Sequence, residues 1–355
     1  MYNQQVLGNG DGTAAATAWS YSPIKYWPNE HGTNAHSDNT DKLTFLAYAP
    51  YVENATINNG ANSTVSDGSG AADEGIIAMT GNAVQADATL TFKVPASSEE
   101  QIDLLYGVLN AKSVNVDGTE EGTVNGPIEN LTKEKTGGKV SILFKHALAK
   151  IAVNIKEVVD QVAPESSINP SEGTDPNWTK VVVKSLTLKG TNIGTQGTLN
   201  LYSGAWTVTT PSTSFVIDPL PSEIAVDSAP TAYPTIDGVD EDGLDNTIDL
   251  MLIPHLDETS DPDVFTQLTG VQIVYYVCTK DEKLATGVSV VENTIDKNFA
   301  TPVDIKKGFQ YNLTILLGLT SVNFNASVQA WDTDLNGNGN ADDDLTIDLP
   351  VNVAS

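Results

Sequence analysis

Apolar and polar residues alternate regularly at the C-terminal end of the chain. From residue 345 to residue 353 every second position holds a large aliphatic residue, and every position between holds a polar residue or proline. A period of two is typical of a β-strand with one apolar face. The strand follows Leu335–Asp344, which is almost wholly Asn, Gly, Ala and Asp. We therefore expect a terminal strand on a polar linker, which pairs either within its own domain or with another molecule.

Glycine (28 residues) and proline (17 residues) separate short β-branched runs along most of the chain. Such runs, bounded by turn-forming residues, predict strands. The best of them are residues 181–188, 214–217, 247–253, 311–317 and 323–331. One segment favours a helix, residues 97–109, where Ser98 is a candidate cap and apolar residues recur at helical spacing. We therefore predict an all-β chain built of sandwiches.

The longest ordered segment is expected at residues 139–159. Alternate residues from Ile142 to Leu148 fall on one face of a strand, whereas the aliphatic residues from Ile151 to Ile155 fall on the opposite face. A strand keeps one apolar face across such a change only if it absorbs an extra residue, so we predict a β-bulge near Ala149–Lys150. His146 shares the first face and is expected to be structural, bonded to a neighbouring backbone group.

The length of 355 residues suggests about two domains. Residues 130–138 are polar and end in two glycines, which makes them the expected boundary. We therefore predict an N-terminal β-sandwich over residues 1–137, a C-terminal β-sandwich over residues 138–332, and a flexible linker with the terminal strand over residues 333–355.

The charge composition narrows the classes of partner. The formal net charge is −28, and all 18 basic residues are lysines. Arginine is the preferred residue for bidentate hydrogen bonds to phosphates and to base edges. Its absence in so acidic a chain argues against nucleic-acid binding. No apolar run reaches the length of a membrane-spanning helix, and no leader follows Met1, so we expect any export signal to have been removed. The single cysteine, Cys278, lies in an apolar run and is expected in the core.

No sequence motif for catalysis is found. The chain has no nucleophile elbow, zinc-protease motif, paired-cysteine motif, phosphate loop or dinucleotide fingerprint. Carboxylates are so numerous that a glycosidase pair cannot be recognised by spacing alone. We therefore expect a protein that is not an enzyme and that needs no cofactor.

One acidic cluster approximates a calcium-binding loop. Asp332, Asp334 and Asn336 occupy the first three ligand positions of the rule, and glycine follows at the turn position. The twelfth position holds Asp343 in place of the usual glutamate, and no helices flank the loop. A solvated linker has the same composition, so both interpretations stay open. The candidate calcium ligands are Asp332, Asp334, Asn336, Asn338 and Asp343.

Several short motifs resemble those of the fimbrillin family, the type V pilus subunits of Bacteroidetes. The segment Tyr21–Pro28 is similar to the family's Tyr-Trp-Pro element, and Leu43–Tyr51 is similar to its aromatic-Ala-Tyr-Ala-Pro-Tyr strand. Val140–Ile151 is close to the Phe-x-His-Ala-Leu-Ala-Lys signature. Further matches are Leu252–Pro254, followed here by histidine where the family often has glutamine, Gly308–Tyr311 and Val328–Trp331. The motifs occur in the family's order.

The resemblance implies two tandem transthyretin-like β-sandwich domains. It also implies export as a lipoprotein, removal of an N-terminal strand by proteolysis, and polymerisation by donor-strand exchange on the cell surface. Two features depart from the family. The lipid-bearing N-terminal cysteine is missing, and the familiar processing proteases cut after arginine, which this chain lacks.

In this interpretation the terminal strand fills a gap in a neighbouring copy within a filament. The side chains that would fill the groove are Leu345, Ile347, Leu349, Val351 and Val353. Three alternatives stay open: pairing of the strand within its own chain, a tip or anchor subunit that does not polymerise, and a monomeric surface lipoprotein that binds glycans or host ligands.

Overall fold

The computed structural model describes part of the chain, and within it every regular element is a β-strand. The described residues are 4–8, 19–24, 26, 43–52, 74–80, 88–95, 101–109, 126–131, 139–157, 179–209, 211–217, 247–254, 266–281, 283–285, 288–317, 322–330 and 346–350. The predicted all-β fold is therefore confirmed. The predicted helix at 97–109 is wrong where it can be checked, because Leu105–Leu109 is a strand and residues 101–104 are not helical.

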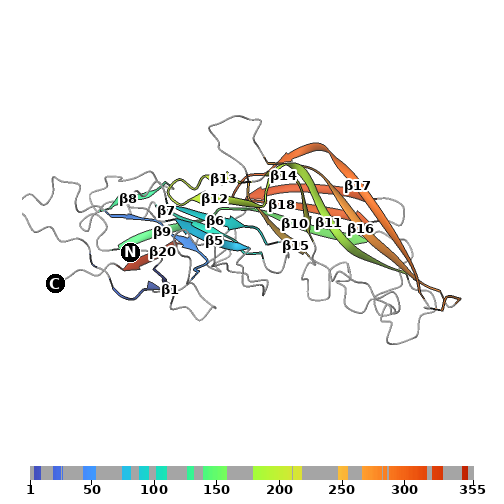
Figure 1. Cartoon of the computed structure of the whole chain (residues 1–355), viewed down its shortest axis with the longest axis horizontal. Coiled ribbons are helices and arrows are strands. Elements are labelled where there is room, and N and C mark those ends of the chain that lie inside the picture. The colour runs from blue at the N-terminus through green and yellow to red at the C-terminus, as the bar shows by residue number, and fades with distance from the viewer. Residues whose placement is uncertain are drawn as a thin grey trace, which may run out of the picture.

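Two four-stranded sheets form the first lobe, on the left of Figure 1. Sheet I has the order β20 (Thr346–Pro350), β9 (Lys139–His146), β7 (Leu105–Leu109), β4 (Tyr48–Ala49). Sheet II has the order β13 (Trp206–Val208), β12 (Gln196–Asn200), β6 (Thr89–Lys93), β5 (Gly75–Thr80). Two small antiparallel pairs accompany them, β3 (Leu43–Phe45) with β8 (Ile128–Leu131) and β1 (Leu7–Gly8) with β2 (Trp19–Ser20).

Two further four-stranded sheets form the second lobe, on the right of Figure 1. Sheet III has the order β15 (Thr247–Leu252), β10 (Ala149–Glu157), β18 (Phe309–Leu317), β19 (Val322–Ala330). Sheet IV has the order β14 (Pro211–Ile217), β11 (Thr179–Gly194), β16 (Gln267–Lys280), β17 (Val288–Asp304). Strands β10 and β18 run parallel, and the other described pairs in these sheets are antiparallel. The long strands β11, β16 and β17 extend to the far end of the molecule.

The hydrophobic core continues from one lobe into the other. A single cluster of buried residues includes Phe92 of sheet II, Leu186 of sheet IV and Ile315 of sheet III. A second cluster lies between sheet I and the β3–β8 pair. Sheet I therefore separates two apolar layers, and all five residues of β7 are buried. Burial on both faces gives a strand a continuous apolar sequence instead of an alternating one.

The predicted bulge near Ala149–Lys150 is wrong. Residues 139–157 form two strands in different sheets, and the register of β10 opposite β15 is regular through Ala149 and Lys150. The chain leaves sheet I after His146 and enters sheet III at Ala149. The change of phase in the sequence therefore records the passage from the first lobe to the second.

Pairings in the first lobe involve strands on both sides of the expected boundary. β9 pairs with β7, and β12 pairs with β6, so sequence after residue 137 contributes to sheets I and II. The predicted domain boundaries at residues 137 and 332 therefore stay predictions. The transthyretin-like topology also stays a prediction. Within the described ranges no helix is long and apolar enough to span a membrane.

Candidate strand-docking site

The terminal strand β20 lies at the edge of sheet I, against β9 of its own chain. The pairing is antiparallel, with Ile347 opposite Ile142 and Leu349 opposite Val140. Pro350, which has no N–H to donate, lies opposite Lys139 at the end of the pairing, a position that suits an edge. The predicted strand is therefore present over residues 346–350, and in this structure it takes the intramolecular alternative. Leu345, Val351 and Val353 lie outside the described residues.

Strand β9 is a firmly packed platform for β20. Val140, Ile142 and Phe144 are buried in the second cluster, with at most 6% of each residue exposed. Leu143, on the opposite face of the strand, belongs to the first cluster. In the docked chain both faces of β9 are covered and β7 pairs with its other edge, so β9 can receive a strand along the edge that β20 occupies.

The N-terminal hairpin borders the same site. Strand β2 contacts β20, and Trp19 of β2 packs against the second cluster. Leu7 of β1 lies opposite Ser20 of β2 in the hairpin. Figure 1 draws β1 and β20 next to each other. The docked terminal strand therefore has β9 on one side and the hairpin nearby.

The last described residue before β20 lies at the junction between the lobes. Ala330, at the end of β19, is opposite Phe309, at the start of β18. Gly308, the residue before Phe309, donates its backbone N–H to the carbonyl oxygen of Leu148 at 2.9 Å. Leu148 connects β9 to β10. The terminal segment therefore begins close to the point where the acceptor strand ends.

Two buried hydrogen bonds fix the crossing from β9 to β10. The indole Nε1–H of Trp206 donates to the carbonyl oxygen of Ala147 at 2.6 Å. The N–H of Ala147 donates to the carbonyl oxygen of Leu104 at 2.8 Å. Satisfying both polar groups of one buried residue holds the crossing in a single conformation.

His146 has a structural partner, as expected, but that partner is a side chain. Its Nδ1 lies 2.8 Å from Oδ2 of Asp103, in the segment that leads into β7. His146 is buried, and so is the second carboxylate oxygen of Asp103, which has no partner in the described part of the chain. The pair ties the end of β9 to the start of β7 across sheet I.

Lys307 joins the two lobes from the second one. Its Nζ donates to the carbonyl oxygen of Gly204 at 2.8 Å and lies 5.2 Å from the centre of the Tyr106 ring. Gly204 has a φ of +70°, and a Cβ there would lie 2.4 Å from Cε2 of Tyr106. Only glycine therefore fits this turn. In the same turn, the hydroxyl of Tyr202 donates to Glu129 at 2.6 Å, which raises the pKa of Tyr202.

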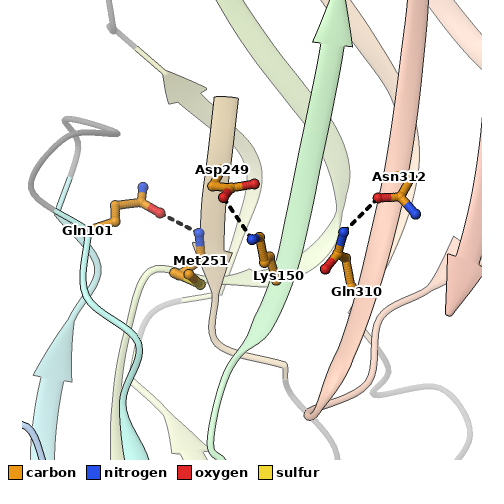
Figure 2. A network of polar contacts seen from close by, with 6 residues as sticks. All are labelled: Gln101, Lys150, Asp249, Met251, Gln310 and Asn312. Atoms are coloured by element: carbon orange, nitrogen blue, oxygen red, sulfur yellow. Dashed lines mark hydrogen bonds and ion pairs between the residues drawn. The ribbon is translucent and has the colours of Figure 1, made fainter. Parts of the chain in front are cut away.

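A second polar network lies across β15, β10 and β18 (Figure 2). Oε1 of Gln101, in the first lobe, accepts the backbone N–H of Met251 in β15. Lys150 of β10 pairs with Asp249 of β15 at 2.7 Å, and Gln310 donates to Asn312 at 2.8 Å along β18. Gln101 also donates to the carbonyl oxygen of Pro95 at 2.9 Å, so one side chain bonds both lobes.

The outer face of sheet IV carries ion pairs that cross the strand between their partners. Lys184 of β11 bonds Glu292 of β17 at 2.9 Å and lies 5.3 Å from the ring centre of Tyr276. The hydrogen bonds that Lys184 donates, to Tyr276 and then to Glu292, raise the pKa of Lys184, and the bond from Lys184 lowers the pKa of Glu292. This face is polar and solvent-exposed, and its pairs are structural.

The predicted calcium ligands Asp332, Asp334, Asn336, Asn338 and Asp343 lie outside the described residues. Among the described residues no three His, Cys, Asp or Glu side chains gather as a metal site. Cys278 lies in β16, opposite Lys180 and Val290. Calcium binding therefore stays a prediction.

Comparisons with known proteins agree with this architecture. A family model described as fimbrillin-like matches residues 2–331. The fimbrium subunit Fim1C of Phocaeicola vulgatus is 25% identical over 219 residues, which is 61% of this chain and 42% of the relative. The chain thus spans less than half the length of that relative. The crystal structure of a fimbrial protein from Bacteroides vulgatus superposes with a TM-score of 0.54 at 19% identity, over 93% of this chain and 85% of that chain, and shares its fold.

Proposed function

Because the chain belongs to the fimbrillin-like family, we propose that it is a structural subunit of a cell-surface pilus that polymerises through its terminal strand. Residues 345–353 of one copy would add to sheet I of a neighbouring copy. The observation that carries the proposal is the pairing of β20 with the edge of β9, in a lobe other than the one that the chain has just left at Ala330.

The acceptor edge has the chemistry that strand addition needs. Main-chain hydrogen bonds along β9 supply affinity for any strand, and the apolar cluster beneath Val140 and Ile142 selects a strand with alternating aliphatic residues. The terminal segment has that alternation in phase, since Ile347 and Leu349 occupy the positions opposite these two residues. Full burial of five aliphatic side chains stabilises by about 10 kcal/mol before ordering costs.

The linker is longer than intramolecular docking requires. Along an extended strand, Leu143, opposite the start of β20, is about 17 Å from Leu148 at the junction. Residues 331–345 would span about 50 Å when fully extended. The excess length lets the same strand reach β9 of another copy.

In this proposal, the chain whose terminal strand docks on its own β9 is the closed form of the subunit. The same backbone pairing forms in either case, as in domain swapping, so closed and exchanged forms differ little in their strand contacts. Local concentration and contacts between the bodies of two copies decide between them. The net charge of −28 keeps free copies apart until they exchange.

Localisation and processing follow from the same proposal. The subunit would be exported as a lipoprotein, trimmed at its N-terminal side and held in a fimbrium at the outer membrane, with other pilus subunits as partners. Its role would be structural instead of catalytic. Calcium at Asp332–Asp343, if bound, would stiffen the linker.

Deletion of residues 345–355 tests the proposal. The truncated chain should remain a folded monomer, because β9 stays paired with β7 and the described strands of the other sheets pair without β20. It should form no filaments by electron microscopy under conditions in which the full chain forms them. Filaments of normal length from the truncated chain would refute donation by this segment.

The intramolecular pairing also favours a second candidate, a subunit that keeps its terminal strand closed, as a tip or anchor would. Such a subunit would stay monomeric at every concentration. Analytical ultracentrifugation across a hundredfold range of concentration separates the two, since only the polymerising subunit forms larger species as concentration rises.

A further inference from the structure

We propose that two exposed apolar patches, one at each end of the terminal segment, form a second interface between successive copies in the filament. The proposal rests on the proposed strand exchange and adds a contact between the bodies of the two copies. The first patch, called the exit patch, comprises Phe309 and Val328. The second, called the entry patch, comprises Leu7, Ile24 and Tyr26.

The exit patch lies where the chain leaves the second lobe. Val328 is opposite Tyr311, which is buried in the core, so Val328 shares the core-facing side of sheet III. Yet Val328 is 53% exposed, and Phe309, on the same side, is 37% exposed. Phe309 lies on β18, directly opposite Ala330, and Val328 lies on β19, which is the edge strand of sheet III among the described strands. The apolar face of sheet III is therefore uncovered at this edge.

Leu7 of the entry patch belongs to the hairpin that borders the docked terminal strand. Leu7 is 56% exposed on β1, whose partner β2 contacts β20. Ile24 and Tyr26 follow β2 in the chain and are 49% and 57% exposed. A hydrogen bond from Gln4 to the carbonyl oxygen of Ser22, at 2.8 Å, holds this segment against the start of the chain. The docking strand thus has an exposed apolar neighbour.

Strand exchange brings the two patches of different copies within reach of each other. The terminal segment leaves one copy after Ala330, beside the exit patch, and its strand β20 would dock in the next copy against the hairpin that carries Leu7. Residues 331–345 limit the distance between Ala330 of the donor copy and the docked strand in the acceptor copy to about 50 Å. Each patch remains exposed in the closed chain, so neither covers the other there.

The occupant is therefore a second copy of this chain, meeting the first in a head-to-tail manner. When the exit patch of one copy packs on the entry patch of another, the first copy still has a free entry patch and the second still has a free exit patch. Such a heterologous contact does not close, and it extends a filament in one direction. Burial of these side chains adds a driving force that the closed chain lacks, which favours exchange over intramolecular docking.

Charge substitutions test the interface. Val328→Glu places a carboxylate in the exit patch, and Leu7→Lys places an ammonium in the entry patch. Val291→Glu is the matched control, because Val291 is also 53% exposed on an edge strand of the second lobe but belongs to neither patch. Light scattering measures the polymerisation rate, and circular dichroism confirms that each monomer melts like the wild-type chain.

Val328→Glu and Leu7→Lys should each slow polymerisation about tenfold or more, as expected from the lost burial of one aliphatic side chain. Val291→Glu should change the rate less than about twofold. The double variant, which sets opposite charges against each other across the interface, should recover part of the rate. A wild-type rate for Val328→Glu or Leu7→Lys, or an equal loss for Val291→Glu, would overturn the interface.

Ile347→Asp separates this outcome from failure of the proposed function. If Ile347→Asp stops polymerisation while Val328→Glu does not, the strand is exchanged but the patches are not an interface. If Ile347→Asp polymerises like the wild-type chain, the strand exchange on which both proposals rest is wrong. If the substitution in the exit patch unfolds the monomer, Leu7→Lys on β1 decides the question by the same rates.

Discussion

Ile347 lies directly opposite Ile142, where the terminal strand pairs with an inner strand of the first lobe. Ile142 is buried in the cluster between sheet I and the β3–β8 pair. The terminal strand follows β19 of the second lobe in the chain, and it pairs with the edge strand β9 of the first lobe. Substitutions at Ile347 or Ile142 can reveal whether the paired strands belong to one copy or to two copies.

Replacing Ile347 by aspartate should block assembly. A carboxylate opposite Ile142 would have to be desolvated in an apolar environment, so we expect at least a tenfold loss of polymerisation rate. The monomer should melt within a few degrees of the wild-type chain, because β9 keeps its pairing with β7 when the terminal strand is displaced. Ile347→Val, which keeps an aliphatic side chain at the same register position, is the control and should assemble at close to the wild-type rate. Unfolding of the Ile347→Asp monomer would instead favour a permanently closed strand.

The terminal strand and the all-β class were accessible from the sequence because alternation and turn residues are local signals. The helix at 97–109 was predicted wrongly for a physical reason. Strand β7 is buried on both faces, so its residues are apolar without alternation, and a continuous apolar run fits a helix as well as a buried strand.

The site itself depends on contacts that the sequence does not encode locally. The partner of His146 is Asp103, 43 positions earlier, and Trp206 bonds Ala147 across 59 positions. The crossing between lobes produced only a change of phase near Ala149, which a bulge explains equally well. Strand order and sheet switching are properties of the packed molecule, so they required the structure.

The turn at Gly204 should tolerate no side chain. Gly204→Ala places a Cβ 2.4 Å from the Tyr106 ring in a left-handed conformation. We expect a loss of at least about 2 kcal/mol in the free energy of unfolding. Gly308→Ala is the control, since it has a similar φ of +72° but open space around the added Cβ, and should lose about 1 kcal/mol. Urea unfolding of both variants measures the difference, and equal losses would contradict the crowding.

The indole of Trp206 should stabilise the crossing between the lobes. In Trp206→Phe the ring remains but the carbonyl oxygen of Ala147 loses its buried donor, which should cost about 1–3 kcal/mol. Because one apolar cluster runs through both lobes, unfolding of the variant should still be a single transition. Two resolved transitions in calorimetry would contradict the continuity of the core.

The ion pair of Lys184 and Glu292 should respond to acid. The bond from Lys184 lowers the pKa of Glu292 in the folded chain, so the pair contributes stability above the pKa of an unfolded glutamate, about 4.3. That contribution is lost as pH falls through the lowered pKa. In Lys184→Met the pKa of Glu292 should return towards its ordinary value, as measured by carboxyl NMR titration. Lys93→Met, far from the pair, is the control, and an unchanged titration of Glu292 in Lys184→Met would contradict the pairing.

The most direct measurement of strand exchange is a disulfide between copies. In a Cys278→Ser background, one protein carries Val140→Cys and another carries Leu349→Cys, two positions that lie opposite each other across β9 and β20. The two proteins are mixed under polymerising conditions and oxidised. Exchange predicts a covalent dimer that requires both proteins and disappears when residues 345–355 are deleted from the second. Abundant filaments without that dimer, alongside efficient disulfide formation when both cysteines are placed in one chain, would contradict it.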